Sequence, residues 1–255
     1  MTFFDLHHNG DGLPLLLPNA WDVASGLAFV EEGFPAIGTT SFGVAAAAGS
    51  PDGGRASKEA TRALAHRLTS LPVYVSADIE DGYSDDPEEV AAYAESLGVD
   101  GVNIEDSSDE HLIDPAHHAA KVAAVKRRAP HLFVNARVDT YWLGQQATVE
   151  ATLARARAYL AAGADGVFTP GATDPAGLRS LADAVDAPLN ILAHPTLPID
   201  ELGRLGIRRV STGSLPYRAA IDAAARVAAT LRDGGTPPTA TPYPQMQQRL
   251  VAYAN

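Results

Sequence analysis

The chain has 255 residues, 46% of them hydrophobic and 20% charged, which is the composition of a folded globular protein with one large core or two small ones. Its formal net charge of −12 argues against a nucleic-acid-binding surface and against a basic face that binds membranes. It contains no cysteine, which excludes disulfides, thiolate metal sites and a cysteine nucleophile.

The chain carries no apolar run long enough to span a membrane. Its first residues, MTFFDLHHNGDG, lack the basic region and apolar segment of a secretion signal. We therefore expect a cytoplasmic protein that has neither nucleic acid nor a membrane as a partner.

Short apolar runs alternate with helical patterns along the chain. Strands are expected at 13–17, 36–39, 73–78, 101–104, 132–136, 166–168, 189–192 and 209–211. Helices are expected at 24–31, 58–68, 87–97, 115–128, 148–162, 175–184, 199–205 and 217–232. This alternation predicts an α/β fold with parallel strands, and about eight units of this length match a closed (β/α)8 TIM barrel. An open, doubly wound sheet is the alternative.

No polar linker divides the chain before its last twenty or so residues, so residues 1–235 are interpreted as one barrel domain. Residues 236–255 are rich in Pro and Thr and end in a short amphipathic piece. They form either a disordered tail or a strap that packs on the barrel or on a neighbouring subunit. The small-residue segment SFGVAAAAGSPDGG, after the second strand, is expected to be a loop that lines the site.

Three carboxylates follow the buried strand that begins at Val73: Asp78, Glu80 and Asp81, with Gly82 next. Like charges this close raise one another's pKa unless a cation lies among them. A few carboxylates with retained waters suit Mg²⁺ better than a cage for Ca²⁺. We therefore expect a Mg²⁺ site here, with ordinary solvated loop acids as the alternative.

Catalytic groups of such barrels project from the carboxyl ends of the strands. The polar residues at those positions are Asp22, Ser41, Asp52, Asp78, Glu80, Glu105, Arg137 and Thr169. A metal cluster and a guanidinium on one rim indicate a site for an anionic substrate. The alternative role of Arg137 is a structural ion pair with Asp139, and the alternative for Asp52 is an ordinary turn.

The motifs at these strand ends resemble those of the isocitrate lyase and phosphoenolpyruvate mutase superfamily. They are N-A-W-D at Asn19–Asp22, G-x-x-S-F-G at Gly38–Gly43, a loop acid at Asp52, D-I-E-D-G-Y at Asp78–Tyr83, V-N-I-E-D at Val102–Asp106 and A-R-V-D at Ala136–Asp139. The resemblance runs from Pro14 to Arg232 with the spacing of the strand ends kept.

The resemblance implies a barrel whose last helix is exchanged between subunits of a homodimer or homotetramer. It implies Mg²⁺ as the cofactor, with Mn²⁺ as a possible substitute. Asp78 resembles the acid that touches the metal, and Asp52, Glu80 and Glu105 resemble acids that hold its waters.

The resemblance also assigns substrate contacts. Thr40, Ser41 and Phe42 match a loop that binds a substrate carboxylate or oxo group, and Arg137 matches the arginine that pairs with the substrate's anionic group. We count Asp52, Arg137 and Ser41 as catalytic candidates. Thr169 and His194, which follow later strands, are additional candidates for substrate binding.

This sequence differs from subgroups of the superfamily at two places, and these differences reduce the number of expected activities. Lyases that split isocitrate or methylisocitrate carry a K-[KR]-C-G-H-type segment after the strand that ends at Glu105, where this chain reads SSDEHLID. The phosphonate enzymes have a longer gating loop there and a histidine at the position of Thr169. We therefore expect neither cleavage of isocitrate or methylisocitrate nor phosphonate chemistry as the first choice.

We expect a Mg²⁺-dependent enzyme that acts on a small 2-oxo or 2-hydroxy (di)carboxylic acid through an enolate-like intermediate, as a C–C lyase or decarboxylase. The alternatives are a C–P bond mutase or hydrolase, a non-catalytic protein that binds a 2-oxo acid, and a barrel with an acidic rim and no metal.

The remaining aromatic and histidine residues are not assigned to the site. We interpret His111, His117 and His118 as surface residues, because they lack metal-ligand spacing. Trp21 and Trp142 are interpreted as packing residues. Tyr83 either closes over the site or stacks on the rim, and no phosphate-cradling motif indicates a nucleotide.

Overall fold

The computed structural model describes residues 1–254 apart from Asn9 and Asp11. Within these residues one parallel sheet has the strand order β1-β11-β10-β9-β8-β5-β4-β3-β2. The strands are β1 (Leu15–Leu17), β2 (Asn19–Ala20), β3 (Ala36–Thr39), β4 (Tyr74–Asp78), β5 (Gly101–Glu105), β8 (Phe133–Arg137), β9 (Gly166–Phe168), β10 (Leu189–Leu192) and β11 (Arg209–Ser211).

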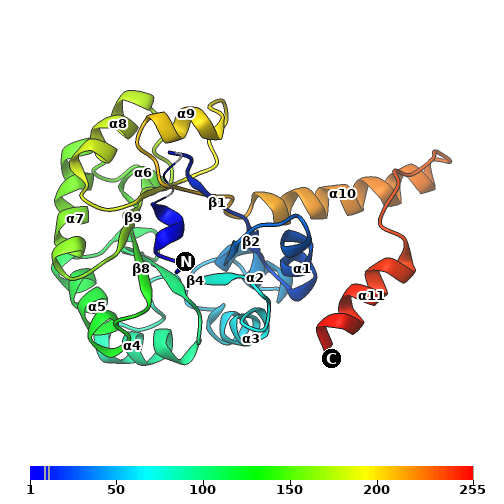
Figure 1. The fold of residues 1–255 in the computed structure, drawn as a ribbon, viewed down its shortest axis with the longest axis horizontal. Helices are drawn as coiled ribbons and strands as arrows, with labels where there is room; N and C mark the ends of the chain where they lie inside the picture. Colours follow the sequence, from blue (N-terminus) through cyan, green and yellow to red (C-terminus); the bar gives the residue numbers. More distant parts are fainter. Residues whose placement is uncertain (9, 11, 255) are drawn as a thin grey trace.

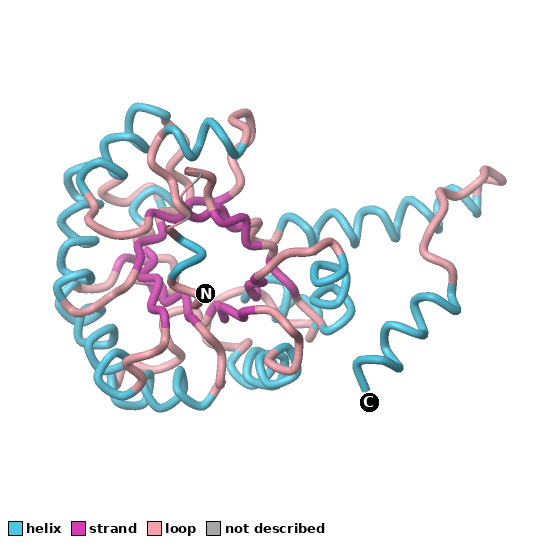
Figure 2. Tube along the Cα trace, viewed as in Figure 1, coloured by secondary structure: helices cyan, strands magenta, loops and turns pink. Residues whose placement is uncertain are grey.

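The two ends of this sheet meet at Pro18, which separates β1 from β2. Pro18 has no N–H for the ladder, but its carbonyl accepts from Gly38 N at 2.8 Å. The preceding carbonyl, that of Leu17, accepts from Thr212 N at 3.2 Å. β1 thus pairs with β11 and β2 with β3, and the strands form the ring seen in Figure 2. The fold is a TIM-barrel-like α/β barrel, and the open-sheet alternative is wrong.

All the predicted helices are present within two residues of their expected bounds, and all except the last surround the ring. They are α1 (Val23–Glu31), α3 (Lys58–Leu68), α4 (Pro87–Ser96), α5 (Pro115–Arg128), α7 (Val149–Ala161), α8 (Pro175–Ala184), α9 (Ile199–Arg204) and α10 (Leu215–Arg232). Shorter elements are the 3₁₀ turn η1 (Asp5–His7), the helix α6 (Thr140–Leu143) and a hairpin of β6 (Ser107–Ser108) and β7 (His111–Leu112).

The segment expected to be a loop after the second strand instead begins as a helix, α2 (Ser41–Ala47). Thr40 caps this helix, since its side chain accepts from Gly43 N at 3.4 Å. The run of alanines that follows has high helix propensity. Of the expected loop, SFGVAAAAGSPDGG, only residues 48–54 lie outside this helix.

The N-terminal segment closes the amino end of the barrel. Figure 2 shows the η1 turn inside the ring of strands. Phe3 and Leu6 are buried there in one cluster with Leu15, Ala36 and Phe133, at the starts of the strands. The opposite end, where the strands finish, is left for the site.

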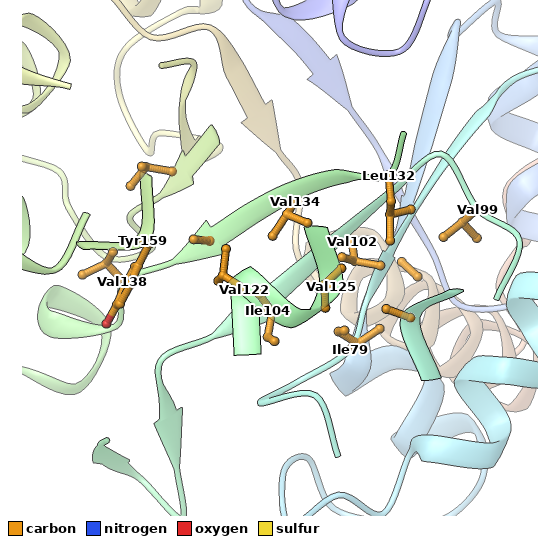
Figure 3. Close-up of a cluster of buried hydrophobic side chains, with 14 of the residues drawn as sticks. Ile79, Val99, Val102, Ile104, Val122, Val125, Leu132, Val134, Val138 and Tyr159 are labelled. Carbon is orange, nitrogen blue, oxygen red and sulfur yellow. The ribbon is translucent and has the colours of Figure 1, made fainter. Parts of the chain in front are cut away.

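The main core lies between the strands and the surrounding helices, as Figure 3 shows for Ile104, Val122, Val125 and Val134. His118 lies on the same buried face of α5, four residues before Val122, and is 0% exposed. The prediction that it is a surface residue is therefore wrong. Its helical spacing with the buried valines was the overlooked signal.

The last two helices extend away from the barrel (Figure 1). α10 has no buried residue, and α11 (Tyr243–Ala254) turns back toward α1 and α3. Arg249 forms an ion pair with Glu31, and Tyr253 Oη donates to the carbonyl of Arg67 at 2.9 Å. The domain boundary at 235 and the exchange of α10 between subunits stay predictions. Among the described helices, none has the length and apolar character needed to cross a membrane.

Candidate active site

A cavity of about 520 Å³ opens at the carboxyl ends of the strands. Of the predicted site residues, the ones that line it are Thr40, Ser41, Phe42, Asp52, Asp78 and Arg137. A second cavity, of about 630 Å³, shares several of these residues and adds Glu80 and Glu105. The folded barrel thus brings together most of the residues that the motifs indicated.

Asp78 ends β4 at the bottom of this site. Its backbone N–H donates to Thr39 Oγ1 at 2.9 Å, and its Oδ2 accepts from Ser41 N at 3.1 Å. These two bonds hold the carboxylate between β3 and the start of α2. Its other oxygen, Oδ1, is buried and has no hydrogen-bond partner among the described residues. A buried carboxylate oxygen without a donor is costly, so this atom is suited to receive a cation.

Glu80 lies two residues further on, in a left-handed conformation with φ of 48°. Its carboxylate accepts from Arg55 N at 2.9 Å and from Ser57 Oγ at 2.5 Å. Burial raises its pKa, and these hydrogen bonds oppose that rise. The loop before α3 therefore holds Glu80 toward the second cavity.

Asp52 faces Asp78 from the same loop. Desolvation raises the pKa of Asp52, and the nearby Asp78 charge raises it further. The side chain of Ser41 lowers the pKa of Asp52 in part. Ser41 thus acts on both acids, since its N–H also donates to Asp78 Oδ2.

Arg137, at the end of β8, is held by two carboxylates. Its Nη1 pairs with Glu105, and its Nε donates to Asp139 Oδ1 at 2.6 Å. The structural pair with Asp139 that was considered as an alternative is therefore present. Asp139 is fixed in turn by Ser107 Oγ at 2.5 Å and, through its N–H, by Asp106 Oδ1 at 2.8 Å. The guanidinium is positioned at the cavity wall by this network.

The residues around Asp78 fit a divalent ion. Within the described part of the chain, no group of three or more His, Asp or Glu side chains is arranged to hold a metal ion. Mg²⁺ does not need three protein ligands, because it keeps several waters and binds through one or two carboxylates. The buried, unpartnered Oδ1 of Asp78, with the carboxylates of Asp52, Glu80 and Glu105 around the same two cavities, matches that coordination.

Comparison with known proteins agrees with this geometry. Residues 3–232 match the phosphoenolpyruvate phosphomutase family. The chain belongs to the isocitrate lyase and phosphoenolpyruvate mutase superfamily.

Three relatives illustrate its place in the superfamily. An uncharacterised protein of Mycobacterium tuberculosis, Rv1998c, is 55% identical over 255 residues, which cover 100% of this chain and 98% of that protein. Oxaloacetate decarboxylase of a Bradyrhizobium species is 32% identical over 184 residues, which cover 67% of this chain and 62% of that protein. The crystal structure of a lyase or mutase candidate from Burkholderia cenocepacia is 31% identical, with a TM-score of 0.88 over 98% of this chain and 94% of that chain.

Two residues predicted to bind substrate in this superfamily member are placed elsewhere. His194 lines neither cavity, and backbone groups occupy both its ring nitrogens, with Nε2 2.9 Å from Thr173 O and Nδ1 2.9 Å from Leu197 N. It organises its own loop. Thr169 is fully buried, its hydroxyl has no partner among the described residues, and it lines neither cavity. Both assignments were based on position after a strand, which does not specify the direction of a side chain.

The structure also gives the positions of two aromatic residues, Trp142 and Tyr83. Trp142 is 55% exposed and lines both cavities, with the Arg137 guanidinium 5.5 Å from its ring centroid. It is a wall of the site rather than a packing residue. Tyr83 packs edge-to-face on Tyr93 and bonds Ser57 Oγ at 2.8 Å, so it supports the loop and does not close over the site.

Sequence reasoning missed two arginines near the acids. Arg55 lines the second cavity and pairs with Asp81 at 2.6 Å, which removes Asp81 from the metal cluster. Arg209, in β11, is fully buried inside the barrel, where its Nη2 donates to Asn103 Oδ1 at 3.2 Å. Burial lowers the pKa of Arg209 to about 9. An arginine that alternates with Val210 in a short strand was the signal for an inward cation.

Proposed function

We propose that the chain is a Mg²⁺-dependent lyase or decarboxylase that cleaves a C–C bond in a small 2-oxo or 2-hydroxy (di)carboxylic acid. The observation that carries this proposal is the buried, unpartnered Oδ1 of Asp78 at the base of the cavity. Mn²⁺ can take the place of Mg²⁺ because both are hard ions that prefer carboxylate oxygens.

Asp78 would hold the ion directly, and Glu80 and Glu105 would hold its waters. When bound, Mg²⁺ supplies Lewis-acid polarisation of the substrate's oxo or hydroxy oxygen. In a 2-oxo diacid the distal carboxylate would leave as CO2, and the electron pair of the broken C–C bond would stay on the carbon next to the carbonyl as an enolate, which then takes up a proton. In a 2-hydroxy diacid the hydroxyl would lose its proton and become the carbonyl of one product, and the electron pair would pass to the carbon next to the other carboxylate, which takes up a proton. Donors already aimed at the oxygen lower the free energy of that charge.

The chain's own residues bind and orient the acid. Thr40, Ser41 and Phe42 line the cavity beside Asp78, and their hydroxyl and backbone N–H groups would donate to the substrate's carboxylate or oxo group. The remaining donors of Arg137 would pair with its anion. Asp52, whose pKa is raised, would hold or release the proton.

The relatives support this reading of the substrate. One is named for oxaloacetate, a 2-oxo dicarboxylic acid. The absence of cysteine in this chain disfavours the lyases that depend on a thiol acid.

The test is pyruvate release from oxaloacetate and from malates that carry a methyl group on C2, with Mg²⁺, with Mn²⁺ and with EDTA. Asp78→Asn should lower metal-dependent turnover by at least about 100-fold, because it removes the directly coordinating charge. Calorimetry should show weaker Mg²⁺ binding by the same variant. Asp183→Asn, at an exposed acid on α8, is the matched control.

Other outcomes would replace the proposal. Equal Mg²⁺ binding by the parent and Asp78→Asn would remove the metal assignment. Turnover of phosphonopyruvate alone would favour C–P chemistry, which the phosphoenolpyruvate phosphomutase match keeps as the second candidate. Saturable binding of acids without any product would identify a non-catalytic binding protein.

We also infer a homodimer or homotetramer in which α10 is exchanged. α10 is an 18-residue helix without a buried residue, and its Ile221 and Leu231 are 53% and 58% exposed. Most of a helix's stability comes from packing of its apolar face, so this helix requires another surface. The barrel of a second copy of the chain would supply such a surface, at the place where its own α10 would otherwise pack.

A further inference from the structure

Two guanidinium groups line the first cavity, of about 520 Å³: Arg137 from β8 and Arg218 from the first turn of α10. They are not equivalent. Arg137 is already paired with Glu105 and Asp139. Among the described residues, Arg218 has no carboxylate within ion-pair distance, and its Nε donates to Ser214 Oγ at 3.3 Å. Arg218 is therefore the cation of this cavity whose charge is still available to an external anion.

Arg218 lies on a different part of the rim from the predicted metal acid. In the ring of strands, β11, which leads into α10, is separated from β4 by β3 and by the strand that Pro18 divides. Both Asp78 and Arg218 nevertheless line the same cavity. A ligand that places one end at Asp78 and Ser41 can therefore extend its other end toward Arg218.

The wall on the far side of the cavity from β4 is largely apolar. It consists of Phe168, Pro170, Leu192, Ala193 and Leu215, with Ser214 beside Arg218. Such a wall accommodates methylene or methyl groups but offers little to a second polar group. The cavity thus has an acidic part for a metal at β4, a largely apolar wall opposite it, and a second cation, Arg218, at the start of α10.

We propose that Arg218 binds the second, distal carboxylate of a dicarboxylic substrate and so selects diacids over monoacids. This inference rests on the proposed function and adds the substrate class. The planar guanidinium fork matches a carboxylate, and Ser214 fixes its Nε side, which leaves the two Nη groups for the ligand. Alkyl substituents of the diacid would contact Leu192 and Leu215.

The test compares two acids of nearly equal shape, malate and 2-hydroxybutyrate, in which a methyl group replaces the distal carboxylate. Calorimetry is performed on the full chain with Mg²⁺ present. We expect the parent to bind malate more tightly. Arg218→Gln should weaken malate binding about 10-fold, equivalent to 1.4 kcal/mol, and leave 2-hydroxybutyrate binding unchanged. Arg218→Lys should fall between the two, because it keeps the charge and loses the fork.

Arg226→Gln is the matched control, since Arg226 lies two turns further along α10, is exposed and lines neither cavity. Its affinities for both acids should equal those of the parent, as should its thermal stability and oligomeric mass. Unchanged malate affinity in Arg218→Gln overturns the inference alone. Equal weakening for both acids also overturns it, because Arg218 would then act on the shared end or on the fold. A parent that binds neither acid overturns the proposed function together with it.

Discussion

His118 shows how a single buried residue couples folding to pH. The ring is fully buried on α5, its centroid is 4.4 Å from that of Tyr159, and neither nitrogen has a partner among the described residues. Burial lowers its pKa from 6.5 to about 3. Below pH 6.5 His118 therefore binds a proton in the unfolded chain but not in the folded chain. The free energy of unfolding accordingly falls as the pH drops from 6.5 toward 3.

His118→Phe should remove this dependence. Between pH 8 and pH 5 the parent should lose about 2 kcal/mol more of unfolding free energy than the variant. Urea denaturation at several pH values measures the two slopes, and His111→Phe, at an exposed histidine, serves as the control. Parallel slopes for parent and His118→Phe would show that His118 is not the titrating group.

At the scale of elements, the turn between β4 and α4 determines where the site acids lie. Glu80, Gly82 and Tyr83 all have positive φ, and Gly82 has the largest at 94°. A Cβ at Gly82 would lie 2.6 Å from Val90 Cγ1 on α4. The tight approach of this turn to α4 therefore requires glycine, and it holds Glu80 next to Ser57.

Gly82→Ala should accordingly lower the unfolding free energy by about 3 kcal/mol, from backbone strain and overpacking together. Gly98→Ala is a useful comparison, because Gly98 also has a positive φ, of 66°, but no atom lies within 4 Å of its added Cβ. It should cost about 1 kcal/mol from strain alone. Denaturant midpoints report both values, and equal losses would mean that Val90 moves away at no cost.

At the scale of the whole molecule, α10 connects the barrel to its expected partner subunit. Ile221→Asp should dissociate the assembly into smaller species, because a carboxylate would be buried in an apolar contact. Ala219→Asp is the matched control, since residue 219 lies two positions away and therefore on the opposite side of the helix. Sedimentation velocity distinguishes them, and an unchanged mass for Ile221→Asp would contradict the exchange of α10.

The sequence by itself determined the barrel and most of its chemical rim. The alternation of strands and helices is a local property of the sequence. The buried strands and the polar residues that follow them could be predicted without knowledge of long-range contacts; these residues are Asp78, Glu80, Glu105 and Arg137. The superfamily motifs that contain these residues could also be recognised from the sequence, and the family match agrees with them. The helix after Thr40 could also have been predicted, because its cap and alanines are local signals.

Only the tertiary structure decided which charges neutralise one another and which side chains reach the cavity. Arg55 forms an ion pair with Asp81, which is therefore not among the acids proposed to bind the metal. Arg137 forms ion pairs with both Glu105 and Asp139, and the His194 ring hydrogen-bonds to backbone groups instead of lining the cavity. These outcomes depend on contacts between strands that are distant in sequence, and on side-chain directions that hydrophobic periodicity does not encode. The same contacts leave Asp78 Oδ1 and Arg218 available, and these two groups carry the proposed chemistry.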